Sequence, residues 1–523
     1  MPLDLSVPVR TAPPKDLEIR PKQAKAWLEA LPLAQSIEAA KMISVNLVAL
    51  SRAKVDVDDR LALLEAYRPI AAVVLDELDA VYSKSPLPLS AKARECLGLA
   101  REIAAEMANG YKIAIVEKTG KLIAFGAKKQ LPLLVFRAME YSSEGLRAAY
   151  KSYTALSAGA WKEMHALYLF AAQEGIAGEV GDAETKLTIN DLYAESLLLS
   201  LTDPYRLIQG EVDKAVELLR ANRGLATLGT SRPATSAAAH FLVPCDTDKA
   251  PKPLTGADDP GGPNARLLDA NPLVDRLRQR KSAIDSGNVS STMSKMVSFD
   301  TMQLMLKLIV LWGDPPKRAF RRDAMDTRVA ICAGLRAVSH FVAEQQRVDI
   351  AAEAEAIDSG ATVPLINVPQ DEASRGMLSE WDVVNSSAGG LKVHRDGSTS
   401  QGISVGEAVG IKFLGKARWT IGVVRWVTSL EDGGLEFGIQ FLAPAARAVA
   451  VTPTINSTST VKIGLLLHES EQSTEADSLL TPPATYADLR EYEVEEDGTV
   501  VVVRATSLIE KTGRFELFHI SPS

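Results

Sequence analysis

Apolar residues recur at the three- and four-residue spacing of an α-helix over most of the first 225 residues. Leu63, Tyr67, Ile70 and Val74, for example, would lie on one face of a helix. This periodicity predicts a helical domain over residues 14–225. Helices paired at a spacing of roughly 40 residues would suit a tetratricopeptide-like solenoid. No repeat consensus is recognisable, however, and a single irregular helical domain is the alternative.

Local signals divide this helical region further. Thr188 and Asp191 have the spacing of a capping box at the start of a helix. Gly110 is typical of a residue that ends a helix. The segment 113–125 has a Thr-Gly pair in its middle, and we expect it to form a short β-hairpin rather than a helix.

Outside this domain the pattern changes three times. Residues 1–13 are rich in Pro and Val and are predicted to be a flexible tail. Residues 226–264 are rich in Thr, Ser, Pro, Asp and Gly, which is the composition of a linker or long loop. Helical spacing resumes over residues 265–312, where two helices at 265–282 and 299–312 are expected to lead into the next domain.

Strand-like patterns dominate from residue 313 onward. Short apolar runs are separated by turns at the regular spacing of a β-barrel or sandwich. Residues 313–450 are therefore predicted to form an antiparallel β-barrel with an insertion at about 334–378. Residues 451–523 are predicted to form a small C-terminal β-module that extends it. The fold class is thus multidomain α+β, with strands at 329–332, 381–384, 390–394, 408–414, 419–428, 435–442, 460–468, 489–494, 499–505 and 515–520.

The composition limits the classes of function that the chain supports. Its 523 residues are too many for one core, and a net charge of −8 argues against a protein that coats nucleic acid. No apolar run approaches the ~20 residues of a membrane span, and residues 1–13 lack the hydrophobic segment of a signal peptide. Cys96, Cys245 and Cys332 are too scattered for a disulfide or metal framework, so we expect a reducing, cytoplasmic location.

Patterns that accompany catalysis are missing from the sequence. It contains no Walker-type glycine loop, no Gly-x-Gly-x-x-Gly, no nucleophile elbow and no histidine pair with the spacing of metal ligands. We therefore expect a protein that is not an enzyme and that holds neither a metal nor an organic cofactor.

The densest positive cluster in this acidic chain is Lys317-Arg318-Ala319-Phe320-Arg321-Arg322. Most charged runs are solvated surface, and that reading applies here too. The cluster nevertheless stands directly before the first β-strand, and Arg318 and Arg322 are spaced as Arg-x-x-x-Arg. Guanidinium groups bind phosphates bidentately and match the O6/N7 edge of guanine. The cluster is therefore a candidate anion or nucleotide site.

A second candidate is the polar turn Asn385-Ser386-Ser387-Ala388-Gly389-Gly390, which follows the apolar strand 381–384. Such a turn places small hydrogen-bonding side chains at the end of a rigid strand, and glycines allow a ligand to approach the backbone closely. Most turns of this composition are only turns. This one becomes informative because it follows the arginine cluster by some sixty positions.

Taken in this order, the two motifs resemble those of PilZ domains, which are small β-barrels that bind the bacterial second messenger cyclic di-GMP. The resemblance consists of Arg318-x-x-x-Arg322, a strand, and then Asn385-x-Ser387-x-x-Gly390. It covers roughly residues 315–450. The segment between the motifs is longer than is usual in the family. The sequence segments 405–407, 419–426 and 435–441 also resemble those of the family.

The resemblance implies roles for the motif residues. Arg318 and Arg322 would close over the phosphates and guanine edges, with Arg321 as a further candidate contact. Asn385 and Ser387 would hydrogen-bond to a guanine edge. The glycines of the turn, Gly390 and with it Gly389, would permit close approach of the ligand.

The implied function is that of a bacterial cyclic di-GMP receptor and effector in signal transduction, which relays the ligand state through its helical domain to a protein partner. The alternative is an interaction scaffold whose barrel is structural and binds no ligand. The two hypotheses differ in the role of the insertion at 334–378. In the scaffold it shields the turn at 385–390, and in the receptor it helps to close over that turn.

Overall fold

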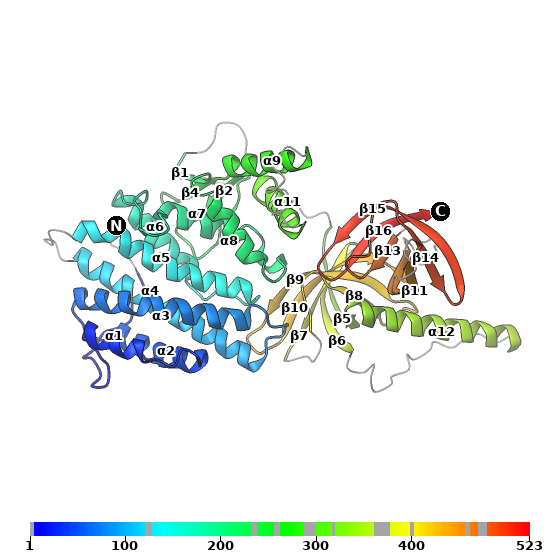
Figure 1. The fold of residues 1–523 in the computed structure, drawn as a ribbon, viewed down its shortest axis with the longest axis horizontal. Coiled ribbons are helices and arrows are strands. Elements are labelled where there is room, and N and C mark those ends of the chain that lie inside the picture. Colours follow the sequence, from blue (N-terminus) through cyan, green and yellow to red (C-terminus); the bar gives the residue numbers. More distant parts are fainter. Residues whose placement is uncertain are drawn as a thin grey trace. The chain divides into compact units, whose positions relative to one another are not determined.

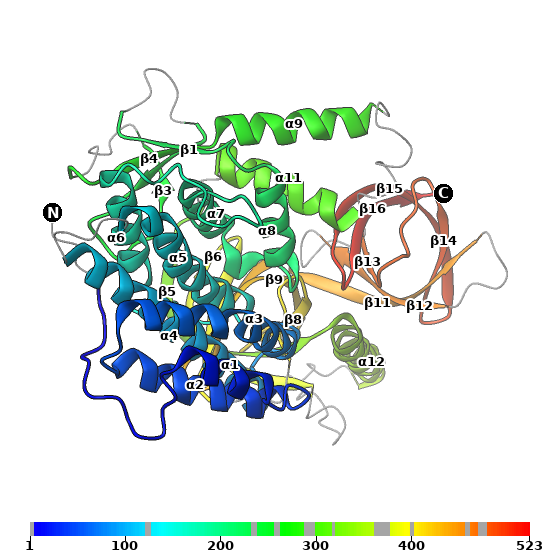
Figure 2. The same cartoon turned by 60° about the vertical axis from the view of Figure 1, so that its left-hand side comes forward.

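The chain divides into two compact units in a computed structural model, here named the helical unit (Met1–Ser85 and Leu89–Lys317) and the β unit (Pro86–Pro88 and Arg318–Ser523). Figures 1 and 2 show both. The structure describes residues 5–120, 127–231, 238–255, 262–286, 299–315, 320–359, 377–397, 402–454, 461–468 and 478–523, without the side chains of 127–128, 299–300 and 349–359.

Long helices that lie side by side form most of the helical unit, as predicted (Figure 1). Its longest members are α3, α4 and α5. Since α3 and α4 contain 26 and 30 residues, the pair exceeds the roughly 34-residue repeat of a tetratricopeptide solenoid. The helices are α1 (Pro21–Glu29), α2 (Ser36–Arg52), α3 (Val57–Tyr82), α4 (Ala91–Gly120), α5 (Ala127–Lys151), α6 (Ala160–Gln173), α7 (Ile189–Ser200), α8 (Glu211–Ala221), α9 (Asn271–Asp285) and α11 (Phe299–Gly313), with a 3-10 turn at Pro204–Arg206.

Two local predictions in this unit have different outcomes. The capping box is confirmed, because the Thr188 side chain accepts from the Asp191 backbone N–H and the Asp191 carboxylate accepts from the Thr188 N–H. The hairpin expected at 113–125 is wrong as far as Gly120, since α4 continues to that residue, and 121–126 lie outside the described residues. Gly110 lies inside α4, where a Cβ would be 2.6 Å from Leu64 Cδ2 of α3. Its small size serves close helix packing rather than helix termination.

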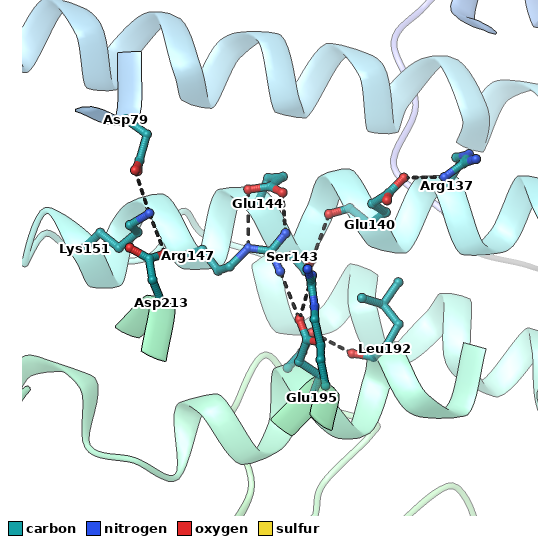
Figure 3. Close-up of polar contacts among 12 residues, drawn as sticks. Asp79, Arg137, Glu140, Ser143, Glu144, Arg147, Lys151, Leu192, Glu195 and Asp213 are labelled. Atoms are coloured by element: carbon teal, nitrogen blue, oxygen red, sulfur yellow. Dashed lines mark hydrogen bonds and ion pairs between the residues drawn. The ribbon is translucent and has the colours of Figure 1, made fainter. Parts of the chain in front are cut away.

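Ion pairs with little solvent exposure fasten α5 to its neighbours (Figure 3). Lys151 Nζ lies 2.7 Å from carboxylate oxygens of both Asp79 and Asp213. Arg147, one turn earlier, pairs with Glu195 of α7 at 3.0 Å. Each cation is matched by carboxylates from other helices, so these contacts connect α5 with α3, α7 and α8.

Two predicted boundaries of this unit are corrected by the structure. Residues 5–13, expected as a flexible tail, bond to several helices: the Thr11 N–H donates to the Arg52 carbonyl of α2 at 2.8 Å, and the Ser6 N–H donates to the Glu163 carboxylate of α6 at 3.0 Å. The expected linker at 226–264 contains strands of a four-stranded antiparallel sheet. These strands have two to four residues each, too short to give a periodic pattern. Three of them lie in the expected linker: β1 (Thr227–Gly229), β2 (His240–Val243) and β3 (Lys252–Pro253). The fourth, β4 (Arg266–Asp269), occupies the start of the segment 265–282 that was expected to be helical, and the helix there, α9, begins only at Asn271.

The β unit contains two closed six-stranded antiparallel barrels, which confirms the predicted fold class. The first barrel has the order β10-β7-β6-β5-β8-β9 and the second β11-β12-β13-β16-β15-β14. Figure 2 shows the second barrel nearly end-on. The strands are β5 (Asp323–Ala333), β6 (Leu378–Ser387), β7 (Gly390–Arg395), β8 (Ala408–Phe413), β9 (Thr420–Ser429), β10 (Leu435–Ala443), β11 (Ala445–Pro453), β12 (Lys462–His468), β13 (Ser478–Thr481), β14 (Glu491–Glu496), β15 (Thr499–Lys511) and β16 (Glu516–Pro522).

The second barrel begins earlier than predicted. Strand β11 starts at Ala445, so the boundary expected at 450 falls inside it. Its alanine-rich sequence has low β-propensity, and pairing with β12 and β14 holds it in the sheet. The four-residue strand β13 was also not predicted, because it is too short to show alternation.

A single helix, α12 (Leu335–Ser359), follows β5 and spans the helical and Ala/Glu-rich parts of the predicted insertion. Its buried Phe341 lies against Trp419 of the first barrel, with ring centroids 5.4 Å apart. The same hydrophobic cluster includes Leu465 and Phe515 of the second barrel. The first turns of α12 therefore belong to a core that both barrels share.

Candidate functional site

Antiparallel pairing of β5 with β6 determines where the two sequence motifs meet. Asp323, at the start of β5, is paired with Ser386, and Ala324 is paired with Asn385 near the end of β6. Arg322 immediately precedes this register, whereas Arg318 lies outside the described residues. The structure thus brings the described end of the arginine motif beside the polar turn, although some sixty residues separate them in sequence.

The described arginines of the motif face solvent. Arg321 has a side chain that is 93% exposed and lies 3.7 Å from the Asp323 carboxylate. Arg322 is also exposed and makes no hydrogen bond or ion pair among the described residues. An exposed guanidinium without a protein partner keeps its donors available for an anion.

Asn385 projects from the outer surface of the first barrel. It is paired with Lys392 of β7, whose neighbours Leu391 and Val393 are buried inside the barrel. Residues directly opposite each other share a face of the sheet, so Asn385 and Lys392 both point outward. The Asn385 amide makes no hydrogen bond among the residues that the structure describes. Ser387 differs, because its hydroxyl donates to the Gly390 carbonyl at 3.2 Å and closes the turn.

The two glycines of the turn meet different neighbours. A Cβ on Gly390 would lie 2.0 Å from the Ile439 carbonyl oxygen and 3.1 Å from Gln440 Cα, both in the backbone of β10. The absence of a side chain there allows two strands of the barrel to approach. A Cβ on Gly389 would instead lie 3.0 Å from the Phe320 ring. The contacts of Gly390 are therefore those of a packing residue, whereas Gly389 lies against the arginine segment.

Phe320 was not among the residues singled out from the sequence, where it is only a spacer between the motif arginines. In the structure it is 57% exposed and its ring lies over Gly389. It is thus a direct contact between the two motifs. The sequence contained one usable signal, an aromatic residue inside a cationic run.

Two further side chains of the outer surface extend the row that begins at Asn385. Lys392 is paired with Gly438 of β10, which is paired in turn with Trp426 of β9. The Lys392 ammonium lies 5.8 Å from the centroid of the Trp426 ring and 2.7 Å from Glu436. A Cβ on Gly438 would lie 2.0 Å from Trp426 Nε1, so the indole lies across that glycine. Only the register between four strands reveals this row.

The described part of the insertion lies at the far end of the strands that carry the site. Helix α12 follows the last residue of β5, Ala333, whereas the motifs meet at the first residue, Asp323. Ten residue steps of extended strand amount to roughly 30 Å. Helix α12 thus begins far from the turn at 385–390 and packs on β8, β11 and β12, whereas residues 360–376 lie outside the described part of the chain.

Comparisons with known proteins agree with this architecture. A family model for the N-terminal domain of the cyclic-di-GMP receptor FimW matches residues 22–234, and one for the middle PilZ domain of FimW matches residues 240–362 and 350–448. The cyclic-di-GMP receptor FimW of Pseudomonas aeruginosa is 24% identical over 483 residues, which cover 82% of this chain and 78% of that protein. No solved structure matches the chain.

Among the described residues, no helix has the length and apolar character that crossing a membrane requires. The matched regions extend over both the helical unit and the first barrel, and the arginine motif and the polar turn fall inside the match to the PilZ model. The chain therefore belongs to the family of PilZ-domain proteins, and its two matched regions are similar to the N-terminal domain and the middle PilZ domain of FimW.

Proposed function

We propose that this chain is a receptor for cyclic di-GMP and binds it where β5 begins and β6 ends. The register supports the proposal, because it pairs Ala324 with Asn385 and Arg322 stands only two residues before Ala324. Neither the Arg322 guanidinium nor the Asn385 amide has a hydrogen-bond partner among the described residues. The similarity to a FimW receptor adds support. In this proposal the protein holds no cofactor and catalyses no reaction.

Each motif residue has a role in the proposed site. Arg318 and Arg322 bind the phosphates and guanine edges by bidentate, charge-assisted hydrogen bonds. Arg321 is a further cationic contact. Asn385 offers both donor and acceptor to a guanine edge, and Ser387 accepts through the lone pairs that its bond to the turn leaves free.

The boundary between the two units supports a relay. It falls between Lys317 and Arg318, directly before the first residue of the arginine motif. A ligand held by Arg318 and Arg322 orders the segment that links the units, and it shifts the population of their arrangements by its difference in affinity for them. In this proposal the helical unit passes the change to a protein partner in the cytoplasm.

Calorimetric titration of the full chain with cyclic di-GMP tests the proposal. We expect saturable binding that Arg322→Ala weakens by roughly 10- to 150-fold, the equivalent of losing charged hydrogen bonds. Arg328→Ala is the matched control, since it removes another exposed arginine of the same segment, one whose partner is Asp382 at 3.0 Å. Unchanged affinity in Arg322→Ala would refute the site.

The same titration separates the receptor from the scaffold. A scaffold gives neither heat nor a thermal shift at high micromolar ligand. A change in hydrodynamic size or scattering profile upon ligand addition, absent in Arg322→Ala, is expected for the relay. Binding without any such change would refute the relay but leave the receptor intact.

A further inference from the structure

Phe320 lies in an unusual environment for a large apolar side chain. It is 57% exposed, and its two chain neighbours on the C-terminal side are the exposed Arg321 and Arg322. Leaving an aromatic ring in water forgoes most of the gain of burying it, which is about 2 to 3 kcal/mol for a whole side chain. An exposed ring beside cations at a candidate nucleotide site is therefore available to a ligand that would cover it.

The position of the ring is determined by the backbone beneath it. Phe320 Cδ2 and Cε2 lie 3.0 and 3.1 Å from the point where a Gly389 Cβ would be. A Cβ at these distances would force the ring to move by a few tenths of an ångström, so the contact is tightest over a glycine. The Gly389 carbonyl accepts from the Phe441 N–H at 3.1 Å, which anchors the turn to β10. The ring thus rests on a rigid base beside Asn385, rather than on another mobile side chain.

We propose that Phe320 is a ligand contact whose ring stacks on one guanine base of cyclic di-GMP, and that Gly389 is needed to seat the ring rather than to admit the ligand directly. This inference rests on the proposed function. A planar ring binds the face of a purine, while the edge of the same base remains open to Asn385. Stacking and edge recognition are therefore carried by different residues of one site.

The stacking role has a chemical signature that simple apolar shielding lacks. Base–aromatic stacking depends on a π-face, and its loss upon truncation weakens binding by roughly 5- to 150-fold. Phe320→Leu keeps apolar bulk but removes the ring, whereas Phe320→Tyr keeps the ring. We expect Phe320→Ala and Phe320→Leu to weaken cyclic di-GMP binding within that range and Phe320→Tyr to stay within about threefold of the wild type.

Gly389→Ala provides a second variant on the opposite side of the contact. The added methyl group meets only the Phe320 ring, an exposed side chain that can give by a few tenths of an ångström, so the fold is expected to survive with an unchanged melting temperature. Affinity should fall by a smaller factor than in Phe320→Ala, because the ring is shifted from its seat but still present. In the double variant with Phe320→Ala, the second change should add less than twofold, since both act through one ring.

Fluorescence gives a readout that affinity alone does not. In Phe320→Trp, cyclic di-GMP is expected to quench the new indole by contact with guanine, measured as the difference from the wild-type titration. Equal quenching in both proteins, or wild-type affinity in Phe320→Ala, would overturn the stacking inference. Wild-type affinity in Phe320→Leu would show that Phe320 acts only by apolar shielding, and it would overturn the stacking inference as well. Absence of binding by the wild type would instead refute the proposed function.

Discussion

Gly390 offers the sharpest test of how the barrel is built at the candidate site. A Cβ added there would lie 2.0 Å from the Ile439 carbonyl oxygen, and real Cβ atoms essentially never come closer than 3.0 Å. Strands β7 and β10 would have to separate by at least 1.0 Å, the difference of those two distances. Because the obstacle is backbone, no rotamer change relieves the clash in Gly390→Ala.

The expected cost follows from the nature of the clash. Overpacking a well-packed site costs about 1–3 kcal/mol, and separating the strands weakens ladder hydrogen bonds worth about 1 kcal/mol each. We therefore expect Gly390→Ala to destabilise the β unit by about 3 kcal/mol. In a unit of roughly 200 residues this corresponds to a melting temperature lower by about 6–12 °C.

Differential scanning calorimetry of the full chain measures this effect. Gly513→Ala is the control, since a Cβ there meets nothing within 4 Å and its melting temperature should not change. Gly389→Ala is the informative comparison, because its obstacle is the side chain of Phe320 and not backbone. A melting temperature within 1 °C of the wild type in Gly390→Ala would refute the assignment of this glycine to strand packing.

Two further predictions concern the cores. Phe341→Ala empties a buried site that α12 shares with both barrels, and it should lower the free energy of unfolding by about 3–5 kcal/mol. Leu414→Ala, at a 92% exposed position, should change it by no more than about 0.5 kcal/mol, and equal melting temperatures of the two variants would contradict the shared core. Burial alone would raise the pKa of Asp182, but hydrogen bonds from Thr185 and Arg137 lower it to about 2 from the ordinary 3.8. The carboxylate then contributes roughly 2 kcal/mol of stability, which is present above pH 4 and lost as the pH falls towards 2. The difference in melting temperature between wild type and Asp182→Asn should therefore shrink over that range. A constant difference would refute this contribution of Asp182.

The sequence alone determined the classes and order of the elements, because helices and strands give periodic patterns that survive without tertiary context. It separated an N-terminal helical region from a C-terminal β region and located most strands of both barrels. It failed where the decisive contact is distant in sequence. Gly110 resembles a helix end until Leu64 of another helix is seen against it. The alanine-rich β11 is a strand only because β12 and β14 flank it.

The candidate site shows the same division. Motif spacing was enough to identify the arginine cluster and the polar turn, since the charge and hydrogen-bonding groups of a side chain follow directly from the residue type. Only the tertiary structure decided that Asp323 pairs with Ser386, that α12 leaves from the opposite end of β5, and that Phe320 lies on Gly389. These are relations between strands and turns, and they depend on a register that a sequence read along one dimension does not contain.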